Sequence, residues 1–165
     1  MTLGRLAGLF YLGTFVSGLL ALAVGAGMAV ANAVATICYV GVTVLFYLLF
    51  RRVNQPVAAI AALFSSAGCI ASALRAFKIT PPINELGLFG CYCILTGYLI
   101  TRSTFLPRWL GVLLSIGGVS WLTFAYAPLG RALSPYNYGP GILAEGLLTI
   151  WLLVYGARES GSARG

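Results

Sequence analysis

The sequence predicts an all-α fold, an integral membrane bundle of six transmembrane helices joined by short loops. Hydrophobic residues make up 60% of the 165-residue chain, charged residues 8%, and the mean hydropathy is +0.96. A water-soluble domain needs a more polar exterior than this composition can supply. Lipid must therefore be the main solvent, and spanning it takes about 20 apolar residues per helix, with backbone groups that bond to one another.

Six apolar runs lie between charges and Pro or Gly breaks, at residues 3–24, 28–50, 56–77, 83–101, 107–127 and 138–155. They form one predicted domain, residues 1–157, followed by a flexible tail over 158–165. Residues 6–50 contain no charge, which is too long for one span, so we expect a break at Gly25-Ala26-Gly27. The first run is longer than the apolar part of a signal peptide and is expected to be a retained anchor.

The third run carries a stripe of small residues, Ala61, Ser65, Cys69 and Ala73, which recur every four positions. Small side chains on one helix face let neighbouring helices approach closely. We therefore expect this helix to lie at the centre of the bundle. Arg75 follows on the same side and is expected to face protein rather than lipid.

The basic residues predict the orientation. With a cytoplasmic N-terminus, seven of them lie on the cytoplasmic side and three on the other, which agrees with the positive-inside rule. The seven are Arg5, Arg51, Arg52, Arg102, Arg108, Arg158 and Arg164, and the three are Arg75, Lys78 and Arg131. We expect both termini in the cytoplasm. The bases are spread over the loops, so the net charge of +7 indicates attraction to lipid headgroups and no nucleic-acid partner.

The sequence predicts neither a metal site nor a cofactor. It has no His, and its four Cys lie inside predicted spans, where Cys91 and Cys93 point to opposite sides of a helix and read as buried thiols. There is also no acid or His beside a nucleophilic Ser and no phosphate-binding Gly loop with Lys. Hydrolase, phosphotransfer and redox chemistry are therefore not supported.

Glu145 lies well inside the last predicted span, residues 138–155, whereas Glu85 lies at the start of the fourth, so Glu145 is the main candidate for function. A charge at the bilayer centre costs about 2.5–3.5 kcal/mol on insertion scales, so an intramembrane carboxyl needs a reason. The predicted topology places it roughly 10 Å below a polar rim on the outer side. That rim contains Arg75, Lys78, Asn84, Glu85, Tyr126, Arg131, Tyr136, Asn137 and Tyr138.

Two interpretations of Glu145 compete. In the structural one, which we favour, the carboxyl pairs with Arg75 or accepts hydrogen bonds from Tyr or backbone groups, and so fixes the helix register. In the functional one, it lines a cavity open to the outer leaflet and holds a proton for chemistry. Glu85 lies at a helix N-terminus, where the helix dipole stabilises an anion. It is a weaker candidate acid.

Five stretches of the chain carry a family resemblance. They are RLAGLFY (5–11), LFYLLFRRVN (45–54), GYLITR (97–102), LPRWLGVLL (106–114) and WLLVYG (151–156), together with Glu145. In this order and spacing they resemble the bacterial multi-pass family filed as domain of unknown function 4386. The resemblance implies a helical protein of the bacterial inner membrane and no activity. The resemblance also implies three polar positions in the relatives: a His at the position of Tyr92, an Asp near the position of Phe124, and an acid at the position of Glu145. This chain keeps only the third.

The sequence favours a non-catalytic or accessory membrane component that packs against lipids, a partner protein or a second copy of itself. One alternative is an enzyme of the terpenoid cyclase or isomerase type. Its acid would be Glu145, acting on a lipophilic or prenyl substrate held by Arg75, Tyr92, Trp121, Phe124, Tyr126 and Tyr138, whose aromatic rings stabilise positive charge. A second alternative is a transporter of small solutes or protons, supported weakly by matching junctions around Arg51 and Arg102.

Overall fold

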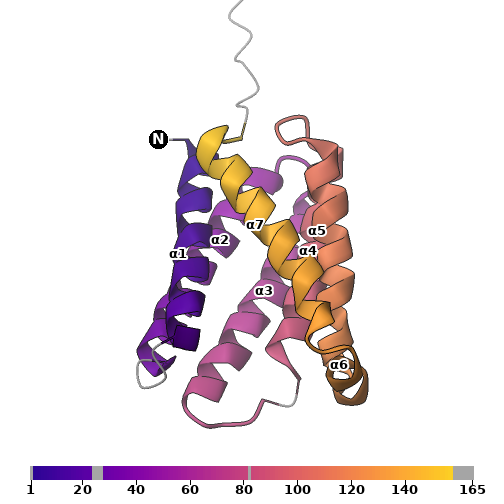
Figure 1. The fold of residues 1–165 in the computed structure, drawn as a ribbon. Helices are drawn as coiled ribbons and strands as arrows, with labels where there is room; N and C mark the ends of the chain where they lie inside the picture. Colours follow the sequence, from indigo (N-terminus) through magenta and orange to yellow (C-terminus); the bar gives the residue numbers. More distant parts are fainter. Residues whose placement is uncertain (1, 24–27, 82, 158–165) are drawn as a thin grey trace, which may run out of the picture.

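The computed structural model describes residues 2–23, 28–81 and 83–157, and they form an all-α fold with no strand in this part of the chain. The expected break at Gly25-Ala26-Gly27 and the expected tail over residues 158–165 lie outside the described residues. Six long helices run alternately up and down (Figure 1). They are α1 (Leu3–Ala23), α2 (Met28–Phe50), α3 (Gln55–Ala76), α4 (Glu85–Arg102), α5 (Arg108–Leu122) and α7 (Gly139–Val154).

The helix starts follow from polar and Pro residues in the sequence. Asn54 caps α3 by accepting a hydrogen bond from the Val57 backbone N–H (3.2 Å), and Pro56 occupies the first turn. Asn84 caps α4 in the same way, with the Leu86 N–H as donor (3.0 Å). An N-cap oxygen satisfies a backbone donor that the helix itself leaves free. Because Asn84 caps the helix, α4 begins at Glu85, two residues after the predicted start.

The segment between α5 and α7 was not predicted correctly. Instead of one span to residue 127, α5 ends at Leu122 and is followed by the short helices η2 (Thr123–Ala125), α6 (Ala127–Leu133) and η3 (Tyr136–Tyr138). Asn137 holds this segment together, because its Nδ2 donates to Thr123 Oγ1 (3.0 Å) and to the Gly130 carbonyl (3.2 Å). Its own backbone carbonyl accepts a bond from Ser120 Oγ (2.6 Å).

The long helices form a closed ring in which each packs mainly against two neighbours, in the order α1, α2, α3, α4, α5, α7 and back to α1. α7 crosses the front of the bundle diagonally and meets α1 near the end that carries the N-terminus (Figure 1), where Arg5 Nη2 donates to the Val154 carbonyl (3.4 Å). The prediction of a central third helix is wrong, since α3 is one member of the ring. Its stripe does face inward, because Ala61, Ser65 and Cys69 are buried.

Three helical segments are long and apolar enough to cross a membrane, Val30–Phe50, Gln55–Ala76 and Arg108–Ala125. α4 has only 18 residues and carries a charge at each end, Glu85 and Arg102, while α7 has 16 residues. By length and composition the fold is therefore compatible with a membrane protein.

Candidate functional site

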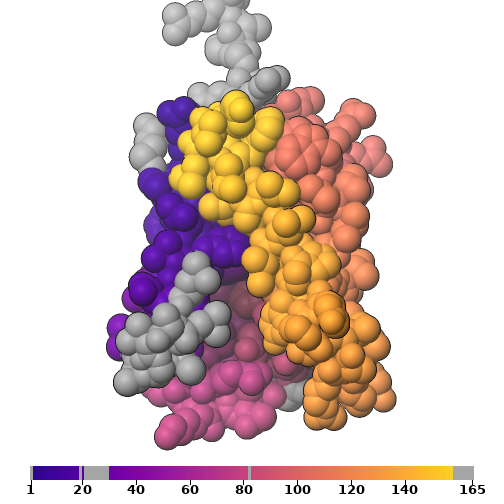
Figure 2. Space-filling view, viewed as in Figure 1, coloured from indigo at the N-terminus to yellow at the C-terminus, as the bar shows by residue number. Residues whose placement is uncertain are grey.

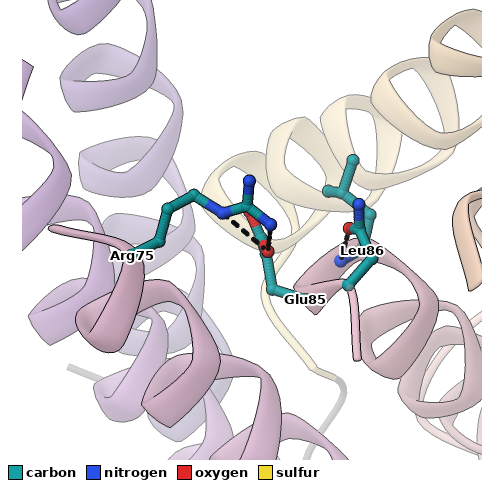
Figure 3. Close-up of polar contacts among 4 residues, drawn as sticks. Arg75, Glu85 and Leu86 are labelled. Atoms are coloured by element: carbon teal, nitrogen blue, oxygen red, sulfur yellow. Dashed lines mark hydrogen bonds and ion pairs between the residues drawn. The ribbon is translucent and has the colours of Figure 1, made fainter. Parts of the chain in front are cut away.

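Glu145 forms no ion pair with any residue that the structure describes. Arg75 lies at the end of α3 and binds Glu85 instead, through its Nη2 (2.7 Å) and Nε (3.1 Å) to one carboxylate oxygen (Figure 3). The expected pairing of Glu145 with Arg75 is therefore wrong. Arg75 was also expected to face protein, but 54% of its side chain is exposed. Because Glu85 is closer to the end of the bundle and in the first turn of α4, it is the acid within reach of this guanidinium.

The Glu145 carboxyl accepts hydrogen bonds from three other helices of the ring. The Trp121 indole Nε1–H of α5 donates to Oε1 (2.9 Å), and the Cys93 thiol of α4 donates to the same oxygen (3.6 Å). The Tyr39 hydroxyl of α2 donates to Oε2 (3.5 Å). The expected hydrogen bond from a Tyr is present, whereas the donors Trp121 and Cys93 were not expected. Oε2 has only the long bond from Tyr39, so it retains the capacity to accept another.

The packing around Trp121 fixes the shortest of these bonds. Gly141 lies one turn before Glu145 on α7, and a Cβ at this position would collide with the Trp121 indole. On its other sides the indole packs against Phe124 (centroids 6.0 Å apart) and edge-on against Tyr138 (5.8 Å). Since the ring cannot move freely, its N–H stays directed at the carboxyl.

Glu145 also faces a cavity of about 200 Å³. All six helices of the ring contribute to its wall, and the lining combines three aromatic rings with small polar groups and no Lys or Arg. The lining residues are Thr14, Asn32, Ala35, Thr36, Tyr39, Cys69, Ser72, Leu86, Phe89, Trp121 and Glu145. Tyr39 and Phe89 pack against each other with centroids 4.5 Å apart. The cavity therefore offers one acid and several aromatic faces to an occupant.

The cavity lies in the half of the bundle opposite the chain termini. Thr14 of α1 and Glu145 of α7 are among its lining residues, and these two helices diverge toward the end of the bundle opposite the N-terminus (Figure 1). Figure 2 shows a recess between the same two helices, with deeper atoms visible inside it.

Toward the terminal end, large apolar side chains close the interior. Phe46, Phe50, Leu99, Leu110 and Leu148 are almost fully buried and belong to one cluster. Their positions along the helices place them on the terminal side of Glu145. The cavity is therefore a pocket with a closed end in this conformation.

Two further hydroxyls lie in the core of the ring. The Tyr11 and Tyr92 side chains are 1% exposed or less, and their OH groups have no hydrogen-bond partner among the described residues. Each ring packs edge-on against Tyr39, with centroids 5.8 Å and 5.9 Å away. Since buried hydroxyls are normally paired, these two groups provide unused hydrogen-bonding capacity beside the residue that binds Glu145.

The sequence-predicted site residues are distributed over four places. Glu145 and Trp121 line the cavity, while Phe124 and Tyr138 pack behind Trp121 and against each other (4.7 Å). Tyr92 lies in the core next to Tyr39. Arg75 and Glu85 form the ion pair at the end of α3 and α4, and the Tyr126 side chain is 66% exposed.

The sequence did not identify four residues of the site: Tyr39, Phe89 and Asn32, which line the cavity, and Cys93, which bonds to Glu145. A usable signal was present in two of them. Tyr in membrane helices is enriched at the interfaces, so Tyr39 near the middle of a predicted span is out of place. Asn32 is likewise an amide within an uncharged apolar run. Phe89 and Cys93 gave no such signal, because apolar side chains and thiols are ordinary there.

The site contains a single acid and lacks the groups of common catalytic or metal centres. Within the described ranges, no cluster of three or more metal-ligating side chains occurs. Among the described lining residues, Glu145 is the only side chain that could act as a base toward a hydroxyl or thiol nucleophile. The arrangement is suited to binding a positively charged or proton-accepting molecule.

Comparison with known proteins confirms the family resemblance over the second half of the chain. The model of Domain of unknown function (DUF4386) matches residues 83–156, which include Cys93, Trp121 and Glu145. An uncharacterized protein of Archaeoglobus fulgidus is 29% identical over 131 residues, covering 73% of this chain and 78% of that protein. No solved structure matches the chain.

Proposed function

We propose that the chain is a six-span integral membrane protein that binds a small lipophilic cation in the Glu145 cavity and does not transform it. The observation that carries this proposal is the Glu145 carboxyl, which lines an aromatic cavity, receives one long hydrogen bond at Oε2, and has no ion-pair partner among the described residues. A buried carboxylate is stabilised by a counter-charge, and aromatic faces attract cations. A lipophilic cation supplies both interactions.

The outer surface supports six spans. Large aliphatic side chains are exposed along the middle of the ring helices, among them Leu9, Ile37, Leu63, Ile116 and Ile150. Exposed aromatic side chains lie at both ends, Tyr98, Trp109 and Tyr155 at one and Tyr126, Tyr136 and Tyr138 at the other. Such belts mark the two membrane interfaces. α7 has only 16 residues, and α6 and η3, which precede it in the chain, would extend the bundle at its N-terminal end.

The orientation we propose has both termini in the cytoplasm. Among the described residues, Arg5, Arg51, Arg52, Arg102 and Arg108 lie at the terminal end, and Arg75, Lys78 and Arg131 lie at the other. This distribution agrees with the positive-inside rule. The cavity would then be reached from the outer half of the bilayer.

Binding of a model cation tests the proposal. A cavity of about 150 Å³ accommodates benzene, so benzyltrimethylammonium suits a cavity of about 200 Å³. Its neutral isostere, neopentylbenzene, has the same shape without the charge. We expect the cation to raise the Tm of the purified protein in neutral detergent more than the isostere does, because a ligand of the native state stabilises it.

The substitution Glu145→Gln should weaken binding of the cation at least tenfold, which is about 1.4 kcal/mol, and leave the effect of neopentylbenzene unchanged. Glu85→Gln is the matched control, since it removes an acid outside the cavity. Equal binding of cation and isostere, or unchanged cation binding in Glu145→Gln, would refute the proposal.

Acid-initiated isomerisation or cyclisation of a short prenyl chain is the second candidate. It is favoured by the presence of a carboxyl and three aromatic faces in one cavity. Products would be sought by mass spectrometry after incubation of the protein in nanodiscs with unmodified and epoxidised prenyl substrates. If the wild-type protein turns over a substrate and Glu145→Gln does not, the enzyme proposal replaces the binding proposal. If the wild-type protein shows no turnover, the enzyme proposal is refuted.

A further inference from the structure

The terminal end of the bundle contains a second hollow, about 700 Å³ in volume, with a strongly basic rim. Arg51 and Arg52 come from the turn after α2, and Arg102 is the last residue of α4. All three are exposed, and none forms an ion pair within the described ranges. The described lining contains no acidic side chain, so no described residue of the hollow neutralises these three positive charges.

The floor of the hollow is apolar. Leu48 and Leu49, in the last turn of α2 before Arg51, line it together with Phe105, and the exposed Thr104 adds a hydroxyl. The guanidinium of Arg102 lies over the Tyr98 ring, 5.5 Å from its centroid. This contact restricts the position of the guanidinium at the end of α4. A ligand that fits must therefore be anionic at one end and apolar at the other.

We infer that this hollow binds the headgroup and upper acyl chains of an anionic phospholipid. Guanidinium groups bind phosphate oxygens through paired N–H donors, and basic pockets between helices on the cytoplasmic side bind anionic headgroups. The positive-inside rule accounts for the sign of these charges. It does not account for three guanidiniums around one hollow with an apolar floor. This inference is independent of the proposed cation site, which lies in the other half of the bundle.

Native mass spectrometry of the detergent-purified protein tests the inference, with phosphatidylglycerol and phosphatidylcholine as probes. We expect the first phosphatidylglycerol to bind at least tenfold more tightly than phosphatidylcholine. The triple variant Arg51→Gln, Arg52→Gln, Arg102→Gln should lose at least tenfold in affinity for phosphatidylglycerol. The single variant Arg102→Gln should lose part of it, and serves if the triple variant does not fold.

A charge-matched control separates a site from general electrostatic attraction. The triple variant Lys78→Gln, Arg108→Gln, Arg131→Gln removes the same number of positive charges from exposed positions outside the hollow. Its affinity for phosphatidylglycerol should stay within about twofold of wild type. An equal loss in both triple variants would overturn the inference, and displacement of the lipid by millimolar inorganic phosphate would show a soluble-anion site instead.

Discussion

Glu145 is stabilised in an apolar bundle by hydrogen-bond donors and not by a neighbouring cation. Bonds to a charged group contribute about 1.5–3 kcal/mol each, and the short bond from Trp121 (2.9 Å) is the strongest of the three by geometry. The bonds from Tyr39 (3.5 Å) and Cys93 (3.6 Å) are longer. The carboxyl is therefore held firmly through Oε1, while most of the acceptor capacity of Oε2 is unused.

Replacement of Trp121 by Phe should destabilise the protein by about 2–4 kcal/mol, because it removes the short donor to a buried carboxyl and leaves a void. Trp109→Phe is the control, since Trp109 is 46% exposed and has no part in the site. Unfolding would be followed by circular dichroism in mixed micelles with increasing sodium dodecyl sulfate. A loss no larger than that of Trp109→Phe would show that the indole donor contributes little.

Replacement of Gly141 by Ala should disturb the same bond from the opposite side. The added methyl group would occupy the position of the Trp121 indole and push the ring away from Oε1. We expect a destabilisation of about 1–3 kcal/mol and a shift in tryptophan fluorescence. Gly139→Ala, at a position with no neighbour within 4 Å, should leave the fluorescence unchanged. Indistinguishable spectra for the two variants would contradict the proposed packing.

At the scale of the helices, α4 and α5 make the closest contact in the ring. A Cβ at Gly90 would lie 2.8 Å from the Gly118 carbonyl oxygen, and one at Gly118 would lie 2.7 Å from the Gly90 oxygen. Backbone cannot yield as a flexible side chain can. Absence of side chains at both positions therefore permits this contact, and the contact sets the distance between Cys93 on α4 and Trp121 on α5, the two donors to Oε1.

Gly118→Ala should force α4 and α5 apart and destabilise the protein by about 1–3 kcal/mol. It should also weaken binding of the model cation, because both donors to Oε1 move. Gly146→Ala is the matched control, since its Cβ would meet nothing within 4 Å and Ala favours a helix over Gly. Equal stability of the two variants, measured by detergent unfolding, would show that the helices can adjust.

Apart from the end of α5, the described boundaries of the long helices lie within two residues of the predicted ones, because they follow from local signals such as Asn54, Pro56 and the charged loops. The sequence did not predict α6, since Pro128 and Gly130 within residues 127–133 indicate a loop when read alone. The helix forms there because the buried Asn137 side chain bonds to Thr123 and Gly130. That contact joins residues whose proximity depends on the fold of the whole segment.

For the whole molecule, the closed ring determines which residues meet at Glu145. Its three donors lie 24, 52 and 106 positions away in the sequence. No local periodicity predicts which side chains from α2, α4 and α5 share one level inside a ring. For this reason the sequence identified Glu145 and Trp121 as candidates but assigned the wrong partner, Arg75, whose charge suggested a pair that the ring geometry excludes.

The ring also predicts which loops share a side of the membrane. Ser134 lies beyond α6 at one end of the bundle and Thr104 lies between α4 and α5 at the other, and both are exposed. In intact cells, a membrane-impermeant maleimide should label Ser134→Cys directly and Thr104→Cys only after permeabilisation. The four native Cys lie inside helices and are buried or half-buried, so the unmodified chain gives the background. Labelling of both positions from the same side would contradict the six-span topology, because an intact α5 must separate them.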